Sequence, residues 1–174
     1  FDASTDGDFV SLWRTDGVVI EEVAELSTFS GGGIGEYALL DDKIVFSARH
    51  NELLREIWVS DGTTAGTFVL ADLYPGGQSS PEQLLTVGDQ VFFVATTPQN
   101  GTELFRTDGT SEGTRLVVDL ETGPLESSNP EILGQLEGRV LFAALTDALG
   151  IEPYVSDGTE AGTSLLLDIN PGVG

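Results

Sequence analysis

The 174-residue sequence predicts an all-β fold, a β-propeller-like array of four-stranded antiparallel blades. Three observations predict it. One motif occurs four times along the chain, at intervals of 45, 47 and 49 residues. Each copy contains short runs rich in Val, Ile, Leu, Phe and Thr, residues that favour a pleated, half-buried surface. Several runs are apolar at every position, so both faces of each sheet should be covered by other layers.

The third copy shows the four strands of one blade in order. They are EQLLTV at 82–87, QVFFVATT at 90–97, TELFRTD at 102–108 and TRLVVDL at 114–120. Between the second and third runs, Asn100-Gly101 is a strong hairpin signal. Antiparallel units of this length that pack on copies of themselves are typical of a β-propeller. A β-sandwich and a β-solenoid are the alternatives.

Two markers with constant spacing identify the repeat. The first is an aromatic followed two residues later by Ala, and the second is an aromatic shortly before Asp-Gly. In all four copies 12 residues separate them, which indicates a rigid pair of strands. The pairs are Phe1 and Trp13, Phe46 and Trp58, Phe93 and Phe105, and Phe142 and Tyr154.

The markers divide a single repeat domain, 1–174, into repeats at about 1–30 (partial), 31–77, 78–124 and 125–174. The chain begins inside a second strand and ends in a linker, so it holds about 3.5 repeats. Propellers usually close with four or more blades, and an open end exposes unpaired strand edges. We therefore expect a fragment of a larger propeller, which further repeats of the same protein or another chain would complete.

Composition excludes several classes of function. The net charge is −22, from 29 acidic and 7 basic residues, which disfavours nucleic acid and anionic lipid surfaces as partners. The absence of Cys excludes disulfides and thiolate chemistry, and a single His, His50, disfavours zinc and Ser-His-Asp sites. No apolar run has the roughly 18 residues of a membrane span.

The motif copies EIWVSDGTTAGTFVLADL at 56–73 and ELFRTDGTSEGTRLVVDL at 103–120 resemble the ELWxxDGT repeats of secreted and surface-exposed bacterial proteins. The first copy, SLWRTDGVVIEEVAEL, departs most, because it lacks the initial Glu and the second Gly-Thr. The loop is also similar to the Asp-box hairpin of sialidase-type propellers. The resemblance implies an extracellular or cell-surface propeller-like protein, and it implies no particular reaction.

The loop aspartates are the first candidate site. Calcium could bind the carboxylates of the four motif loops and of the acidic TDGDF stretch, although calcium needs six to eight oxygens. The alternative is an Asx turn, in which the Asp accepts backbone N–H groups and Gly provides a positive φ. The shared pattern favours the turn. The candidates are Asp16, Asp61, Asp108, Asp157, Asp6 and Asp8.

Two further acidic sets repeat. Glu56, Glu103 and Glu152 precede the motif aromatic by two residues, and they are either a cation-binding cluster or, as we expect, solvated strand ends. Acids that end the fourth strands should cap N–H groups of the linkers, including those of Ser79-Ser80 and Ser127-Ser128. These acids are Asp72, Asp119 and Asp168.

The motif aromatics, His50 and Asn100 are the remaining candidate residues. The motif aromatics are expected in blade-to-blade cores rather than in a sugar-stacking ring. His50 lies on a hairpin and is expected to be solvated. Asn100 begins an Asn-Gly-Thr glycosylation sequon on a hairpin tip.

The sequence therefore predicts a non-enzymatic extracellular structural or interaction module for adhesion, matrix or surface assembly, with protein or glycan partners. A calcium- or carbohydrate-binding propeller is the first alternative. A fragment of a propeller hydrolase is the second, although paired carboxylates at catalytic distance cannot be identified among 29 acids.

Overall fold

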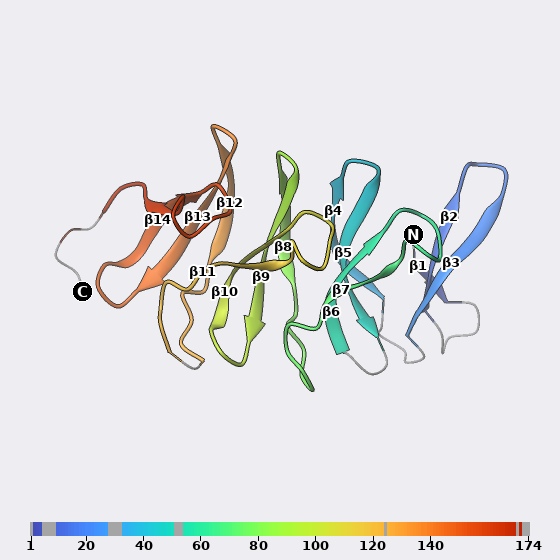
Figure 1. Ribbon diagram of the computed structural model, residues 1–174, viewed down its shortest axis with the longest axis horizontal. Helices are drawn as coiled ribbons and strands as arrows, with labels where there is room; N and C mark the ends of the chain where they lie inside the picture. The colour runs from blue at the N-terminus through green and yellow to red at the C-terminus, as the bar shows by residue number, and fades with distance from the viewer. Residues whose placement is uncertain are drawn as a thin grey trace.

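The computed structural model describes residues 2–4, 10–27, 33–50, 54–123, 125–169 and 171. These residues form fifteen strands in four antiparallel sheets, and the all-β, propeller-like prediction is confirmed (Figure 1). Within the described ranges no helix is long and apolar enough to cross a membrane. Asp6 and Asp8 lie outside the described residues.

Each sheet is one blade, and its strands follow one another in chain order. Blade 1 has three described strands: β1 (Asp2–Ser4), β2 (Val10–Thr15) and β3 (Ile20–Ser27). Blade 2 has four: β4 (Ile34–Leu40), β5 (Lys43–His50), β6 (Leu54–Ser60) and β7 (Phe68–Ala71). Blade 3 has β8 (Glu82–Val87), β9 (Gln90–Thr97), β10 (Gly101–Thr107) and β11 (Arg115–Val118). Blade 4 has β12 (Glu131–Leu136), β13 (Arg139–Thr146), β14 (Gly150–Ser156) and β15 (Ser164–Leu165).

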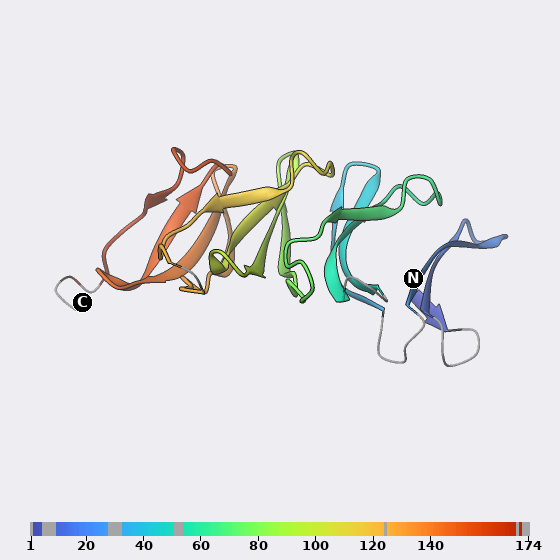
Figure 2. The same ribbon diagram turned by 60° about the horizontal axis from the view of Figure 1, so that its bottom comes forward.

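The four blades stand face to face in an open row, with blade 1 at one end and blade 4 at the other (Figures 1 and 2). The strands of each blade fall within one of the four repeats delimited from the sequence. The hairpin predicted at Asn100-Gly101 is also confirmed, since Thr97 pairs with Gly101 across the turn. Gly101 has a φ of 65°, and a Cβ there would overlap the carbonyl of Glu126 in the linker.

Apolar cores lie between successive blades. The core between blades 2 and 3 joins Val45, Ile57 and Leu70 to Phe93 and Phe105. Equivalent cores join blade 1 to blade 2 and blade 3 to blade 4. Trp58, Phe105 and Tyr154 are buried, and each stacks on the marker Phe of its own blade at 5.7 to 6.3 Å between ring centroids. The prediction of blade-to-blade aromatics is thus confirmed for these three residues.

Every such core is built from two different faces. We call the side that packs on the following blade the forward face; Leu70 in blade 2 and Val117 in blade 3 belong to it. The opposite side is the back face, which carries the marker Phe and the motif aromatic. Because side chains alternate along a strand, one strand supplies residues to both faces. Both faces of blades 2 and 3 are apolar because each packs on a neighbouring blade.

The first strands of neighbouring blades are linked by polar contacts. Glu36 of β4 accepts a hydrogen bond from the Leu84 amide of β8 at 3.1 Å, and the Leu39 carbonyl accepts one from the Thr86 hydroxyl at 2.5 Å. In turn, the Gln83 side chain accepts one from the Ile132 amide of β12 at 2.7 Å. Strands β4, β8 and β12 therefore form the shared edge along which the blades converge.

Candidate functional site

The motif loop of blade 2 connects β6 to β7 and is an Asx turn. Asp61 Oδ1 accepts hydrogen bonds from the amide of Thr63 at 2.8 Å and from its hydroxyl at 2.7 Å. The Thr63 hydroxyl accepts one from the Gly66 amide, and Thr67 Oγ1 donates to the Thr63 carbonyl. The Asp and both Thr residues of DGTxxGT therefore bond to one another within the loop.

The same network recurs in blades 3 and 4. Asp108 and Asp157 accept bonds from Thr110 and Thr159, at 2.6 to 2.9 Å in each loop. The Thr63 and Thr159 hydroxyls hold the pKa values of Asp61 and Asp157 below the usual range, because they stabilise the charged carboxylates. The loop aspartates are thus acceptors that serve the turn.

The second glycine of the motif has a steric role. A Cβ on Gly66, Gly113 or Gly162 would overlap the carboxylate of the loop Asp in the same blade. These glycines are needed for space, since their φ values are not positive. The first glycine of each DGT differs, because Gly62, Gly109 and Gly158 have φ values of 82° to 91°.

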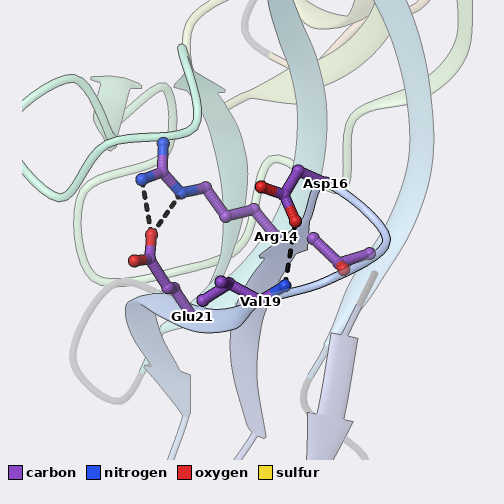
Figure 3. Close-up of a pocket in the computed structure, with 5 residues that line it drawn as sticks. Arg14, Asp16, Val19 and Glu21 are labelled. Atoms are coloured by element: carbon purple, nitrogen blue, oxygen red, sulfur yellow. Dashed lines mark hydrogen bonds and ion pairs between the residues drawn. The ribbon is translucent and has the colours of Figure 1, made fainter.

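The loop of blade 1 keeps the Asp acceptor and loses the rest of the network. Asp16 Oδ1 accepts hydrogen bonds from the amides of Val18 and Val19 at 2.8 and 2.9 Å, and these bonds lower its pKa, the Val19 bond most. Arg14 forms an ion pair with Glu21 across the hairpin, and these side chains line a surface pocket together with Asp16 (Figure 3). Val18 is fully exposed at the tip.

The repeated glutamates lie in the most deeply buried part of the blades, and the expectation of solvated strand ends is wrong. Glu56, Glu103 and Glu152 are 0%, 0% and 1% exposed. Glu56 accepts hydrogen bonds from the Ser79 amide, the Ser79 hydroxyl and the Leu73 amide at 2.5 to 3.1 Å. Glu152 accepts one from the Ile169 amide at 2.7 Å. Each glutamate thus binds the segment that follows the fourth strand of its blade.

Burial of these carboxylates changes their acidity. It raises the pKa of Glu103 to about 7, although hydrogen bonds from Ser128 act in the opposite direction, and the charge of Asp119 adds to the increase. Burial also raises the pKa of Glu56. The surroundings of Glu56 and Glu103 do not form a metal site, because among the described residues no group of three His, Cys, Asp or Glu side chains could hold a metal ion.

The acids that end the fourth strands do not bind Ser79 and Ser128 as expected, because the buried glutamates occupy that position. Asp119 Oδ2 instead accepts a hydrogen bond from the Asn100 amide nitrogen, Nδ2, at 2.7 Å. The sequon nitrogen is therefore engaged in this structure. His50 is half-buried rather than solvated, with its ring 5.7 Å from that of Trp58.

The sequence did contain a signal for the buried glutamates. Glu56 and Glu103 stand directly before apolar residues at consecutive positions, which face both sides of the sheet, as in EIWV at 56–59 and ELF at 103–105. A strand with both faces covered leaves no solvated position in its interior. Blade 1 has Ser11 at this position, and that side chain is also buried.

No family model and no curated protein matches the chain. Similar solved structures include an acylaminoacyl peptidase of Pyrococcus horikoshii, with a TM-score of 0.51, 14% identity, and coverage of 95% of this chain and 24% of that one. A prolyl endopeptidase has a TM-score of 0.54 and 18% identity, with coverage of 99% of this chain and 25% of that one. TolB of Acinetobacter baumannii has a TM-score of 0.52 and 17% identity, with coverage of 93% of this chain and 38% of that one. The blades are those of a β-propeller. This chain spans about a quarter to two fifths of the length of these proteins, and the likeness concerns the fold.

Proposed function

We propose that this chain is a non-enzymatic module of an extracellular or cell-surface protein, which serves as a structural or interaction scaffold. The observation that supports it most is the use of the repeated polar residues. Asp61, Asp108 and Asp157 form turns, and Glu56 and Glu103 hold linkers. The repeated polar residues of the motif therefore stabilise the turns and linkers of the blades.

The resemblance to ELWxxDGT repeats and the net charge of −22 support a place outside the cell or on its surface. A highly acidic surface keeps a repeat protein soluble while its apolar blade faces stay covered. The fold neighbours include peptidases, but at 14 to 18% identity the likeness concerns the fold and not the reaction. The half-buried contact between His50 and Trp58 supports a packing role for the single histidine.

Localisation and activity are tested separately. Antibodies against the module should label intact cells of the source organism or detect the protein in the medium, and external protease should remove the signal. Labelling only after lysis would contradict the proposal. The purified module should not hydrolyse N-acylated or proline-containing chromogenic peptides. Hydrolysis that disappears in His50→Ala would instead favour the hydrolase alternative.

A further inference from the structure

A pocket lies between blades 3 and 4, at the end of the blades that is opposite to the motif loops. It is lined on blade 3 by Glu82, Gln83, Val94 and Thr102, and on blade 4 by residues 129–132. Its volume is about 420 Å³, which is within the range of pockets that hold small ligands. Thr102 stands near the start of β10, whereas the motif loop follows the end of that strand. The pocket is therefore separate from the motif loops.

The corresponding place between blades 2 and 3 is filled by an arginine of this chain. Blade 3 follows blade 2 at an interval of 47 residues, which aligns the pocket residues with their counterparts. The aligned pairs are Gly35 and Glu82, Ser47 and Val94, and Arg55 and Thr102. Arg55 Nη1 donates hydrogen bonds to the Gly33 carbonyl and to the carbonyl and hydroxyl of Ser47, at 3.4 to 3.5 Å. A Cβ on Gly35 would overlap this nitrogen. Blade 2 thus supplies a guanidinium group at this place from its own sequence.

Blade 3 has the opposite charge at the same place. Glu82 carries a carboxylate, and Thr102 is too short to fill the space that Arg55 occupies in blade 2. The Thr102 hydroxyl instead bonds to that of Thr96 at 2.8 Å. Glu131 adds a second carboxylate from blade 4, and no basic residue lines the pocket. Both glutamates are exposed, and neither side chain has a hydrogen bond or ion pair with any residue that the structure describes. The pocket thus combines two carboxylates without a cation.

We propose that this pocket binds the guanidinium group of an arginine side chain from a partner protein. A guanidinium presents its N–H donors in a planar fork that matches carboxylates, and such charge-assisted pairs are stronger than neutral hydrogen bonds. Arg55 shows that the gap between two blades of this chain accommodates the group beside a strand carbonyl. Calcium fits the pocket less well, because it needs six to eight oxygens and no three acids come together within the described ranges.

The charge of the whole chain favours the same class of partner. A net charge of −22 attracts basic segments from a distance, and salt weakens that attraction. Because this attraction is general, the pocket is recognised by a preference for arginine and by its dependence on the two glutamates. The inference rests on the interaction role proposed above and deepens it, since it names the chemistry of the partner.

Nuclear magnetic resonance of the isotope-labelled chain tests the proposal with three short peptides, acetyl-Gly-X-Gly amides in which X is arginine, lysine or citrulline. Citrulline has the shape of arginine without its charge. We expect saturable shifts of the Thr102 and Ile132 amides with the arginine peptide, at a Kd on the order of 1 mM because one side chain makes few contacts. The lysine peptide should bind more weakly, and the citrulline peptide should not saturate.

Glu82→Gln/Glu131→Gln should weaken binding of the arginine peptide about ten-fold or more, because it removes both charged acceptors. Glu112→Gln/Glu160→Gln is the matched control. It changes the net charge equally at two exposed glutamates in the motif loops of blades 3 and 4. The control should stay within about two-fold of the parent, since exposed charges far from the ligand contribute little.

Thr102→Arg should place a guanidinium of the chain itself in the pocket, as Arg55 does in blade 2. It should block the arginine peptide, and circular dichroism should show that all variants are folded. A lack of saturable shifts with the arginine peptide would overturn the proposal. So would equal affinities for arginine and citrulline, or unchanged binding in the Gln variant of Glu82 and Glu131. Any of these results would leave the test of surface localisation untouched.

Discussion

Glu103 on β10 and Ser128 in the linker to blade 4 are joined by two hydrogen bonds inside the protein. The Ser128 amide donates to Oε1 at 2.6 Å, and its hydroxyl donates to Oε2 at 2.5 Å. Both residues are completely buried. A buried carboxylate is costly without partners, and here the donors come from a segment 25 residues further along the chain. The linker thereby becomes part of the interior of the blade that precedes it.

The stability of the protein should fall as the pH rises through 7. The pKa of Glu103 increases from about 4.5 in the unfolded chain to about 7 in the folded one. A raised carboxyl pKa means that the folded state holds the proton more tightly. The resulting stabilisation is complete below pH 4.5 and is lost by about pH 8, with a magnitude on the order of 3 kcal/mol. Thermal melts between pH 5 and 8 should show the decrease.

Other acids also titrate in this chain, so Glu103→Gln isolates the contribution of Glu103. Glutamine is neutral at every pH and can accept from the Ser128 amide while donating to its hydroxyl. The melting temperature of the variant should depend less on pH and should equal or exceed that of the parent at pH 8. An unchanged slope would show that Glu103 does not titrate in this range. Ser128→Ala should destabilise the protein most at high pH.

Replacing the second glycine of a motif loop should destabilise the protein. In Gly113→Ala the new methyl group overlaps the Asp108 carboxylate, and overpacking of this kind costs about 1 to 3 kcal/mol. Asp108→Ala frees the same space, so the double variant should lose less stability than the two single variants combined. Urea denaturation measures all four proteins. Strict additivity would contradict the steric explanation.

The motif aromatics should contribute much of the energy that holds the blades together. Phe105→Ala removes a buried ring between blades 2 and 3, and it should cost about 3 to 5 kcal/mol of unfolding free energy. Phe68→Ala is the control, because Phe68 on β7 is 42% exposed and its loss should cost clearly less than that of the fully buried ring. Equal losses in denaturant melts would mean that the rings do not stabilise the blade interface.

Calcium at millimolar concentration should leave the melting temperature unchanged. The Asp61 and Asp157 carboxylates already accept hydrogen bonds in their own loops, and a ligand that binds the folded state at 100 times its Kd would add about 2.7 kcal/mol. Differential scanning fluorimetry with calcium and with a chelator measures this. A clear increase would restore the calcium alternative, and its loss in Asp6→Asn/Asp8→Asn would place the ion at TDGDF.

The repeat and its strands could be predicted because they depend on local patterns. The spacing of 12 residues between Phe93 and Phe105 arises because the two rings face each other across β9 and β10. The Asx turn at Asp108 is equally local, since every partner lies within six residues. Such signals need no knowledge of the neighbouring blades.

The environment of the glutamates could not be predicted in the same way. Ser128 follows Glu103 by 25 residues, and a two-sided apolar run was needed to suggest that Glu103 is buried. The role given to Asp119 failed for a related reason: a carboxylate at the end of a strand and one inside it look alike in sequence. Only the packing of the linker distinguishes them.

The glutamate-to-linker bonds shift the cooperative unit of this protein relative to its sheets. A shortened chain that ended after β11 would retain every strand of blade 3 and still leave Glu103 without Ser128. Blades 2 and 3 therefore each take part of their interior from the start of the next repeat, through Ser79 and Ser128. Loss of a blade should therefore destabilise the blade that precedes it in the chain. A repeat that could be transplanted intact would extend from one linker serine to the next rather than from the first strand of a blade to its fourth.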